Sequence, residues 1–516
     1  MMTRDETPRP DHTSLGQGKG FDYWRRTTGF FLAPAVAVII WLTPFPNLSV
    51  EAHRLAGVAS VVIIFWITEA IPIPATALLG VSLAVLLGVA PAKSILTAFG
   101  DQIIFLFIGS FMLARAMQRH GLDRRIAYAL LAHPWVGGNT HRTLWAVGLT
   151  AWLLSMWISN TAAVAMLFPV ALAIAQETGH IVSRQTLGSG EPPSRNYTTA
   201  LLLMLAFAGS VGGVATPVGT PPNLIGIALI AEGLQVRITF FRWMMFALPL
   251  AVLMLLAIYG TMLLLFPPEL RHVPGQLDLM RQRQRELGAW TAGQRNALAA
   301  FSLAVFLWIM PGLVALILGA AAPAVMTLQQ RLSEGTVALL AASLLFLLPT
   351  SWSRREFTLS WDEAVQIDWG TVLLFGGGIA LGRMFFDTGL ATALSSAFLS
   401  VVDVDSPRIL AGAAALVAVI ISETSSNTAS ASMVVPVMLS IGKTMGSSGF
   451  VLAVAATLGA SLGFMLPVST PPNAIVYGSR AVRILDMVKA GIVIDVIGIL
   501  LVWAVAIWLV PAVLGS

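Results

Sequence analysis

Two short polar motifs occur twice in the sequence, and their side chains could bind ions. Ser-Asn-Thr occupies residues 159–161 and 426–428, and each copy interrupts a strongly apolar stretch. Thr-Pro-Pro-Asn follows each copy, at 220–223 and 470–473. Hydroxyl and amide groups donate and accept hydrogen bonds, and their oxygens can coordinate small cations. The four motifs therefore indicate a binding site for a small polar or charged solute.

Each motif is expected to begin or end a helix. Ser and Asn compete for backbone hydrogen bonds and favour helix ends. Thr220 and Thr470 suit the N-cap position, with proline in the first turn. Four helix N-termini, each acting like roughly half a positive charge, would suit a small dianion. The carbonyl groups that end the preceding helices, with the Ser and Asn oxygens, would suit Na⁺.

Signals for enzymatic chemistry are weak. The sequence has no cysteine, which excludes disulfides, thiolate metal sites and cysteine nucleophiles. A glycine-lysine-threonine stretch at 442–444 lacks the upstream glycine of a phosphate-binding loop, because residue 437 is Val. The sequence shows no paired carboxylates, HExxH motif or Ser/His set of the kind that catalysis needs. We therefore expect that the protein is not an enzyme.

The composition is that of an integral membrane protein. Hydrophobic residues make up 57% of the 516 residues and charged residues only 11%, whereas about a quarter of a soluble domain is charged. Apolar runs of about 18 or more residues recur from end to end. The net charge of +5 is spread over loops, so we attribute it to membrane orientation and expect no nucleic-acid partner.

Eleven membrane spans and two re-entrant hairpins are expected. The hairpins lie near 143–177 and 407–442, each with Ser-Asn-Thr at its middle. Most Lys and Arg residues then fall on the cytosolic side, although Arg237 and Arg242 do not. This places the protein in the cell (inner) membrane, with its N-terminus in the cytoplasm and its C-terminus outside. The spans lie near 28–46, 54–71, 73–91, 100–118, 199–231, 243–266, 297–322, 335–350, 369–388, 448–478 and 486–512.

The two halves of the chain form an internal repeat. The Ser-Asn-Thr copies lie 267 residues apart, and the stretch from Phe107 aligns with that from Phe375 without gaps. We expect an all-α polytopic fold that contains an inverted repeat, preceded by one extra N-terminal span. Each half holds five spans and one re-entrant hairpin, a design of secondary transporters whose sites lie near the membrane midplane.

Three of the charged residues within these apolar segments are notable. Arg115 and Arg383 occupy matching places in the repeat, and a structural ion pair or carbonyl contact is favoured over substrate contact for both. Glu423 lies three residues before Ser426 and is costly in a membrane. A structural or gating role and direct ion coupling remain open for Glu423.

The paired motifs, together with "ITEAIPIPATALLG" and "SETSSNTAS", resemble those of the divalent anion:sodium symporter (DASS) family. The resemblance runs from about residue 28 to the C-terminus. It implies a homodimer in membrane lipid, whose protomers have a scaffold domain and a transport domain that moves as an elevator. It also implies that the Ser-Asn-Thr motifs lie at hairpin tips and the Thr-Pro-Pro segments in two broken spans.

The resemblance also implies roles for individual residues. Substrate carboxylates would meet Asn160, Thr161, Thr220, Asn427, Thr428 and Thr470. A first sodium site would use Ser155, Ser159, Asn160 and the backbone at Gly219. A second would use Ser422, Ser425, Asn427 and the backbone at Ser469. Relatives often have threonine where this chain has Ser425.

The same resemblance suggests how the domains follow one another along the chain. The expected parts are a cytosolic tail at 1–27, scaffold spans at 28–118, a first transport part at 119–231 with the inner hairpin, scaffold spans at 232–388 with a basic cytosolic loop at 267–296, a second transport part at 389–478 with the outer hairpin, and a last span at 479–516.

The expected function is sodium-coupled import of C4-dicarboxylates such as succinate, malate or fumarate. Two alternatives stay open within transport. One is a sodium-independent dicarboxylate or anion exchanger, and the other is a sodium-coupled citrate or sulfate carrier. From other classes, a channel-like protein and a membrane-embedded enzyme are disfavoured, the former because of the inverted repeat.

Overall fold

The structure is a computed structural model that describes residues 20–186, 195–273, 275–319, 321–401, 406–445 and 449–514. Most of the expected cytosolic tail at 1–27 lies outside the described residues.

The described part of the chain is almost entirely helical, as expected from its apolar runs. The helices of the first half are α1 (Phe21–Leu42), α2 (Val50–Thr68), α3 (Ile73–Leu86), α4 (Ala92–Leu96), η1 (Thr97–Gly100), α5 (Gln102–Arg119), α6 (Leu122–Leu131), α7 (Thr140–Ser155), α8 (Asn160–Thr186), α9 (Asn196–Gly212), η2 (Gly213–Ala215), α10 (Pro221–Leu234) and α11 (Phe240–Leu265).

The second half continues in the same way and adds one short hairpin of strands. Its elements are α12 (Gln276–Glu286), α13 (Ala292–Leu318), α14 (Pro323–Arg331), α15 (Glu334–Leu347), β1 (Pro349–Ser351), β2 (Glu356–Phe357), α16 (Trp361–Ala364), α17 (Trp369–Asp387), α18 (Leu390–Val401), α19 (Pro407–Thr424), α20 (Asn427–Thr444), α21 (Phe450–Gly459), α22 (Pro471–Gly478), α23 (Ile484–Ala504), η3 (Val505–Leu509) and α24 (Val510–Leu514). The strands pair antiparallel.

Ten helices of the described residues are long and apolar enough to cross a membrane. The spans expected near 73–91, 335–350 and 448–478 contain shorter apolar helices instead, which are α3, α15 and α21. In the last of these spans the eight-residue helix α22 follows α21. An all-helical polytopic architecture is therefore confirmed. The number of crossings stays a prediction.

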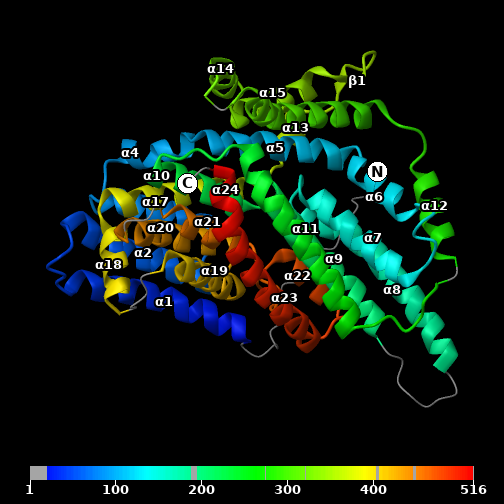
Figure 1. The fold of residues 1–516 in the computed structure, drawn as a ribbon, viewed down its shortest axis with the longest axis horizontal. Coiled ribbons are helices and arrows are strands. Elements are labelled where there is room, and N and C mark those ends of the chain that lie inside the picture. The colour runs from blue at the N-terminus through cyan, green and yellow to red at the C-terminus, as the bar shows by residue number, and fades with distance from the viewer. Residues whose placement is uncertain are drawn as a thin grey trace, which may run out of the picture.

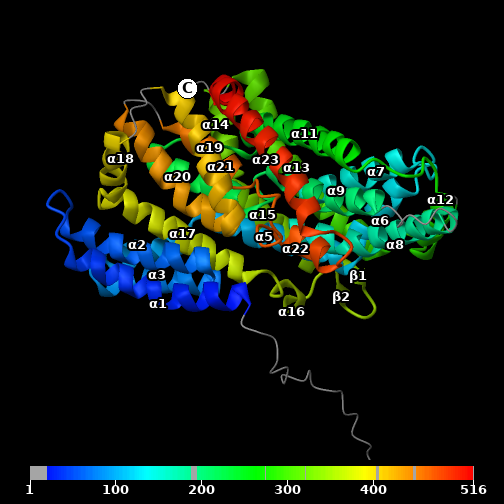
Figure 2. The same cartoon turned by 90° about the horizontal axis from the view of Figure 1, so that it is seen from below.

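Helix groups cover two edges of the molecule, and one helix is buried along most of its length. In Figure 1, α13, α14 and α15 lie along one edge next to α5, and in Figure 2, α1, α2 and α3 lie along another edge next to α17. Helix α9 lies towards the right of both views, and its residues from Thr199 to Gly212 are all buried. A helix that is apolar on every side has to be enclosed by protein or lipid on every side. Here the neighbouring helices α7, α8 and α11 provide that enclosure.

Candidate functional site

Both Ser-Asn-Thr motifs lie where one helix ends and the next begins. Helix α7 ends at Ser155 and α8 begins at Asn160, and α19 ends at Thr424 while α20 begins at Asn427. The hydroxyl groups of Ser159 and Ser426 accept hydrogen bonds from amides three residues on, each at 3.2 Å. They therefore cap the helices that follow, as the preference of serine for this position predicts.

The Thr-Pro-Pro-Asn motifs also follow breaks, and each begins a helix with proline in its first turn. Thr470 accepts a hydrogen bond from the amide of Asn473 at 3.3 Å. Thr220 occupies the equivalent N-cap position, but its side chain makes no cap hydrogen bond. The predicted N-cap position is thus confirmed for both threonines. Only Thr470 also makes the capping hydrogen bond with its side chain.

The asparagine that ends each motif holds the unwound backbone before it. The side-chain amide of Asn223 donates to the backbone carbonyls of Gly213 at 2.9 Å and Thr216 at 2.8 Å. The side-chain amide of Asn473 donates to the backbone carbonyls of Gly463 at 3.2 Å and Leu466 at 3.1 Å. Both asparagines are completely buried. No individual role was predicted for these two asparagines, although their recurrence in both motifs was a usable signal.

The residues predicted for the first sodium site lie close together. The Ser155 hydroxyl donates to Oδ1 of Asn160 at 2.5 Å, and Nδ2 of Asn160 donates to the Ser210 carbonyl at 3.4 Å. A Cβ placed on Gly213 would lie 2.4 Å from Oδ1 of Asn160 and 2.9 Å from the carbonyl oxygen of Gly219. Hydroxyl, amide and carbonyl oxygens thus meet where helix α9 ends, which is a ligand set suited to Na⁺.

The second set has the same arrangement on the other half of the chain. The Ser422 hydroxyl lies 2.7 Å from Oδ1 of Asn427, and a Cβ on Gly463 would lie 3.2 Å from that hydroxyl and 3.3 Å from Cβ of Ser469. Ser425 differs from the others, because its buried hydroxyl donates to the Ile421 carbonyl at 2.7 Å. The structure therefore brings Ser422, Asn427 and Ser469 together. The ligand role of Ser425 stays a prediction.

A cavity of about 580 Å³ lies between the two sets. All six residues predicted to meet substrate line it, and so do Ser159, Gly219 and Ser469. The opposite wall comes from α3, α5, α17 and the residues next to them, which carry no repeated motif and were not predicted. That wall consists of Ile73, Pro74, Phe107, Phe111, Asp368, Gly370, Thr371 and Leu374.

The cavity is suited to an anion although its described lining contains no Lys, Arg or His. Helices α8, α10, α20 and α22 all begin at lining residues, so their partial positive ends and free amides face one space. Its one acidic lining residue, Asp368, accepts a hydrogen bond from the amide of Thr371 at 3.1 Å and caps α17. The arrangement can therefore hold a small anion through neutral donors.

The two arginines of the repeat lie outside this lining. Arg383 forms ion pairs with Asp101 at 3.4 Å and Glu232 at 3.1 Å, so the expected structural ion pair is confirmed. Arg115 donates a hydrogen bond to the side chain of Gln366. Each arginine therefore links its own helix to another segment of the chain.

Glu423 is buried and shapes the second set of residues. Its carboxylate accepts hydrogen bonds from the amides of Met465 at 2.7 Å and Leu466 at 3.1 Å, and from the Ser469 hydroxyl at 2.5 Å. The structural role that was left open for Glu423 is thus observed, because these contacts fix the connection between α21 and α22.

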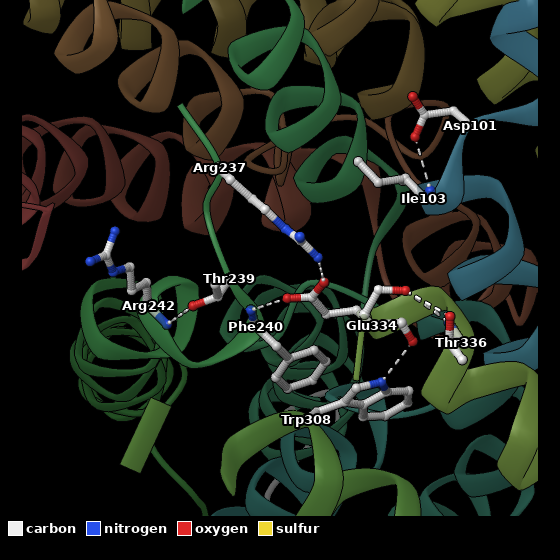
Figure 3. Close-up of polar contacts among 10 residues, drawn as sticks. Asp101, Ile103, Arg237, Thr239, Phe240, Arg242, Trp308, Glu334 and Thr336 are labelled. Carbon is white, nitrogen blue, oxygen red and sulfur yellow. Dashed lines mark hydrogen bonds and ion pairs between the residues drawn. The ribbon is translucent and has the colours of Figure 1, made fainter. Parts of the chain in front are cut away.

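An ion pair fixes the connection that leads into α11. Arg237 donates to Glu334, the first residue of α15, at 2.7 Å (Figure 3). The other carboxylate oxygen accepts from the amide of Phe240 at 3.4 Å. This pairing also neutralises Arg237, one of the two residues that did not fit the expected orientation. The Arg242 side chain points away from the pair of Arg237 and Glu334 (Figure 3).

Replacing Glu334 with Gln should lower the free energy of unfolding by about 1 kcal/mol, because the side chains of Glu334 and Arg237 are only 20% and 44% exposed. Thermal unfolding of the purified protein in detergent would measure this. The matched control is Glu356→Gln, which breaks the more exposed pair with Arg354 and should change stability by less than about 0.5 kcal/mol. Equal effects at the two sites would contradict the prediction.

Comparison with known proteins identifies the family. The family model described as the sodium:sulfate symporter transmembrane region matches residues 25–515. The sodium-dependent dicarboxylate transporter SdcS of Staphylococcus saprophyticus is 32% identical over 491 residues, which is 94% of this chain and 92% of that protein. SdcS of a Staphylococcus aureus strain is 31% identical over the same shares.

Two solved structures share the fold at 13% sequence identity. The YdaH transporter of Alcanivorax borkumensis has a TM-score of 0.51, with 95% of this chain and 98% of that chain covered. MtrF of Neisseria gonorrhoeae has a TM-score of 0.53, with 92% and 97% covered. At this identity the likeness concerns the fold alone. The family-model match over almost the whole chain decides the assignment, and this chain therefore belongs to the sodium:sulfate symporter family, the DASS family whose paired motifs it carries.

Proposed function

We propose that this protein is a secondary active transporter that couples the inward movement of sodium to the uptake of a C4-dicarboxylate such as succinate, malate or fumarate. The observation that carries the proposal is the cavity itself. Two Asn-Thr pairs and four helix N-termini meet there, flanked by two sets of oxygen ligands. The names of the SdcS relatives, sodium-dependent dicarboxylate transporters, support the same reading.

The coupling follows from charge. A dianion held only by neutral donors and helix ends gains from a cation bound a few ångströms away, since opposite charges attract strongly away from bulk water. Asn160 and Asn427 each belong both to a predicted cation site and to the cavity wall. In the proposed order Na⁺ binds first and orders the hairpin tips, and the dianion then binds to the completed site.

The movement that we propose is an elevator within a homodimer. The Ser-Asn-Thr and Thr-Pro-Pro-Asn segments would move together as the transport domain against a scaffold that includes α3, α5 and α17. Five of the eight wall residues from these helices and their ends have apolar side chains, which supports such a sliding surface because they offer no hydrogen bonds to break. The N-terminus in this proposal is cytoplasmic and the C-terminus is outside.

Uptake of labelled succinate into proteoliposomes tests the proposal. An inward sodium gradient should raise the initial rate at least about tenfold over equimolar choline, because sodium completes the anion site. Unlabelled malate and fumarate should compete, and sulfate should compete less, because two Asn-Thr pairs lie across a cavity from each other. If uptake is independent of sodium but requires dicarboxylate inside the proteoliposomes, the protein is instead an exchanger.

A further inference from the structure

One ion pair joins a helix that begins at a motif to a helix of the opposite cavity wall. Arg383, in α17, pairs with Glu232, in the last turn of α10, at 3.1 Å. The domain boundary that was expected after residue 231 falls inside α10, which ends only at Gln235, a residue with a φ of 57°. Hinges lie in loops or at the ends of elements. Glu232 therefore belongs with the part of the chain that carries the first Thr-Pro-Pro-Asn motif.

The pair lies at the end of the contact that is farthest from the cavity. Helices α10 and α17 pack against each other, and each begins at the cavity, where Pro221 and Thr371 form part of its lining. Glu232 lies about 16 Å beyond Pro221 along α10, and Arg383 lies about 18 Å beyond Thr371 along α17. The ion pair therefore connects the far ends of two helices that start at the site.

Along the same contact α17 presents glycine to its neighbours. A Cβ on Gly382 would lie 2.1 Å from Cδ2 of Leu229 in α10, and a Cβ on Gly378 would lie 3.0 Å from the hydroxyl of Ser432 in α20. Small residues of this kind let membrane helices approach closely. Among the described residues, the pair of Arg383 and Glu232 is the one ion pair between α17 and a helix that begins at a motif.

A second charged contact lies beside the first. Lys443, at the end of α20, donates a hydrogen bond to the carbonyl of Gly233 and lies 5.5 Å from the ring centre of Phe386 in α17. A cation at this distance is attracted to the face of an aromatic ring. The ends of α10 and α20 are thus both attached to the last turns of α17.

Arg383 is also held from its own side. Asp101 pairs with Arg383 at 3.4 Å and caps α5 by accepting a hydrogen bond from the amide of Ile103 at 3.0 Å (Figure 3). Asp101 and Arg383 both belong to the proposed scaffold. If α10 moves against α17, the contact with Asp101 is kept and the contact with Glu232 has to break.

The other half of the chain lacks an equivalent ion pair. Arg115 matches Arg383 in the repeat, and its side chain donates to Gln366. The 250-residue spacing of the Thr-Pro-Pro-Asn motifs puts the apolar Val482 where Glu232 stands in the first half. Inverted-repeat transporters alternate by moving one bundle against the other around a fixed site. In the opposite state the second half would take the place of the first, and Arg115 would meet no carboxylate at Val482.

We propose that the ion pair between Arg383 and Glu232 is a conformational latch, which stabilises the state of the protein described above and breaks whenever the motif-bearing helices move against α17. This inference rests on the proposed function for the existence of two states. A contact that exists in one state only shifts the equilibrium by its own free energy. The side chains are 22% and 36% exposed, so we expect the pair to change the ratio of the two states about fivefold.

Distances between two spin labels test the latch without substrate. The chain has no cysteine, so cysteines introduced at the exposed residues Glu177 in α8 and Asp362 in α16 carry the only labels. In liposomes without dicarboxylate, Glu232→Gln should raise the population of the second distance relative to the first about fivefold over the labelled parent. Glu232→Asp should raise it less, because it keeps the charge. An excess of unlabelled protein removes distances between protomers.

The matched control is Asp101→Asn, which removes the other carboxylate from the same arginine. Asparagine caps helices as well as aspartate does, and the lost pair lies within the proposed scaffold, so the ratio should stay as in the parent. Arg383→Gln should shift the ratio about as much as Glu232→Gln, and the double variant should shift it no further, because the two changes remove the same contact.

Two results would overturn the proposal. One is a distance distribution that neither Glu232→Gln nor Arg383→Gln changes, which would make the pair a static brace. The other is a shift in Asp101→Asn as large as that in Glu232→Gln. The proposed function fails separately, if the parent protein takes up no dicarboxylate under a sodium gradient. The distance populations still test the latch in that case.

Discussion

Asn160→Ala and Asn427→Ala should each reduce sodium-driven succinate uptake below detection. Each asparagine provides an oxygen beside a serine hydroxyl and also lines the cavity, so one substitution removes a cation ligand and an anion donor together. A hydrogen bond to a charged group is worth about 1.5–3 kcal/mol, which is roughly 10- to 100-fold in affinity for each ion. Initial uptake rates in proteoliposomes at matched protein density measure the loss.

The control for this prediction is Asn296→Ala. Asn296 donates to the carbonyl of Pro349 at 3.0 Å and to Thr358 at 2.9 Å, away from the cavity, so its loss should affect stability and leave uptake at matched density close to wild type. The site variants should elute from size-exclusion chromatography as wild type does. Near-normal uptake by both Asn160→Ala and Asn427→Ala would refute the site.

Gly213→Ala should abolish most sodium-driven uptake, whereas Gly463→Ala should retain a large part of it. A Cβ on Gly213 would lie 2.4 Å from Oδ1 of Asn160, which is closer than real Cβ contacts, and 2.9 Å from the Gly219 carbonyl oxygen. The backbone and Asn160 must therefore separate, which opens the first predicted sodium site. We expect the sodium concentration for half-maximal uptake to rise at least about tenfold, equivalent to about 1.4 kcal/mol.

At Gly463 the closest atoms are the Ser422 hydroxyl at 3.2 Å and Cβ of Ser469 at 3.3 Å. These atoms need to move by only a few tenths of an ångström, so the sodium requirement should rise less than in Gly213→Ala. The two variants control for each other, because both place a methyl group after a helix end beside a predicted cation site. A larger effect at Gly463 than at Gly213 would contradict this account.

The sequence alone determined the class of protein and the repeated motifs that line one side of the cavity. Apolar runs dictate membrane helices whatever their neighbours, because a buried backbone in lipid must satisfy its own hydrogen bonds. The breaks at Asn160, Asn427, Pro221 and Pro471 were equally local, since Ser, Asn and Pro act on their own helix ends. Recurrence of both motifs then indicated one shared site.

Contacts between distant segments were decided only by the tertiary structure. The cavity wall of Phe107, Phe111 and Leu374 consists of apolar residues that look in the sequence like any other part of a span. Arg383 and Asp101 form an ion pair although they lie 282 residues apart along the chain. Their contact depends on the approach of α17 to η1. No local pattern encodes such an approach, because it arises from how helices far apart in sequence pack together.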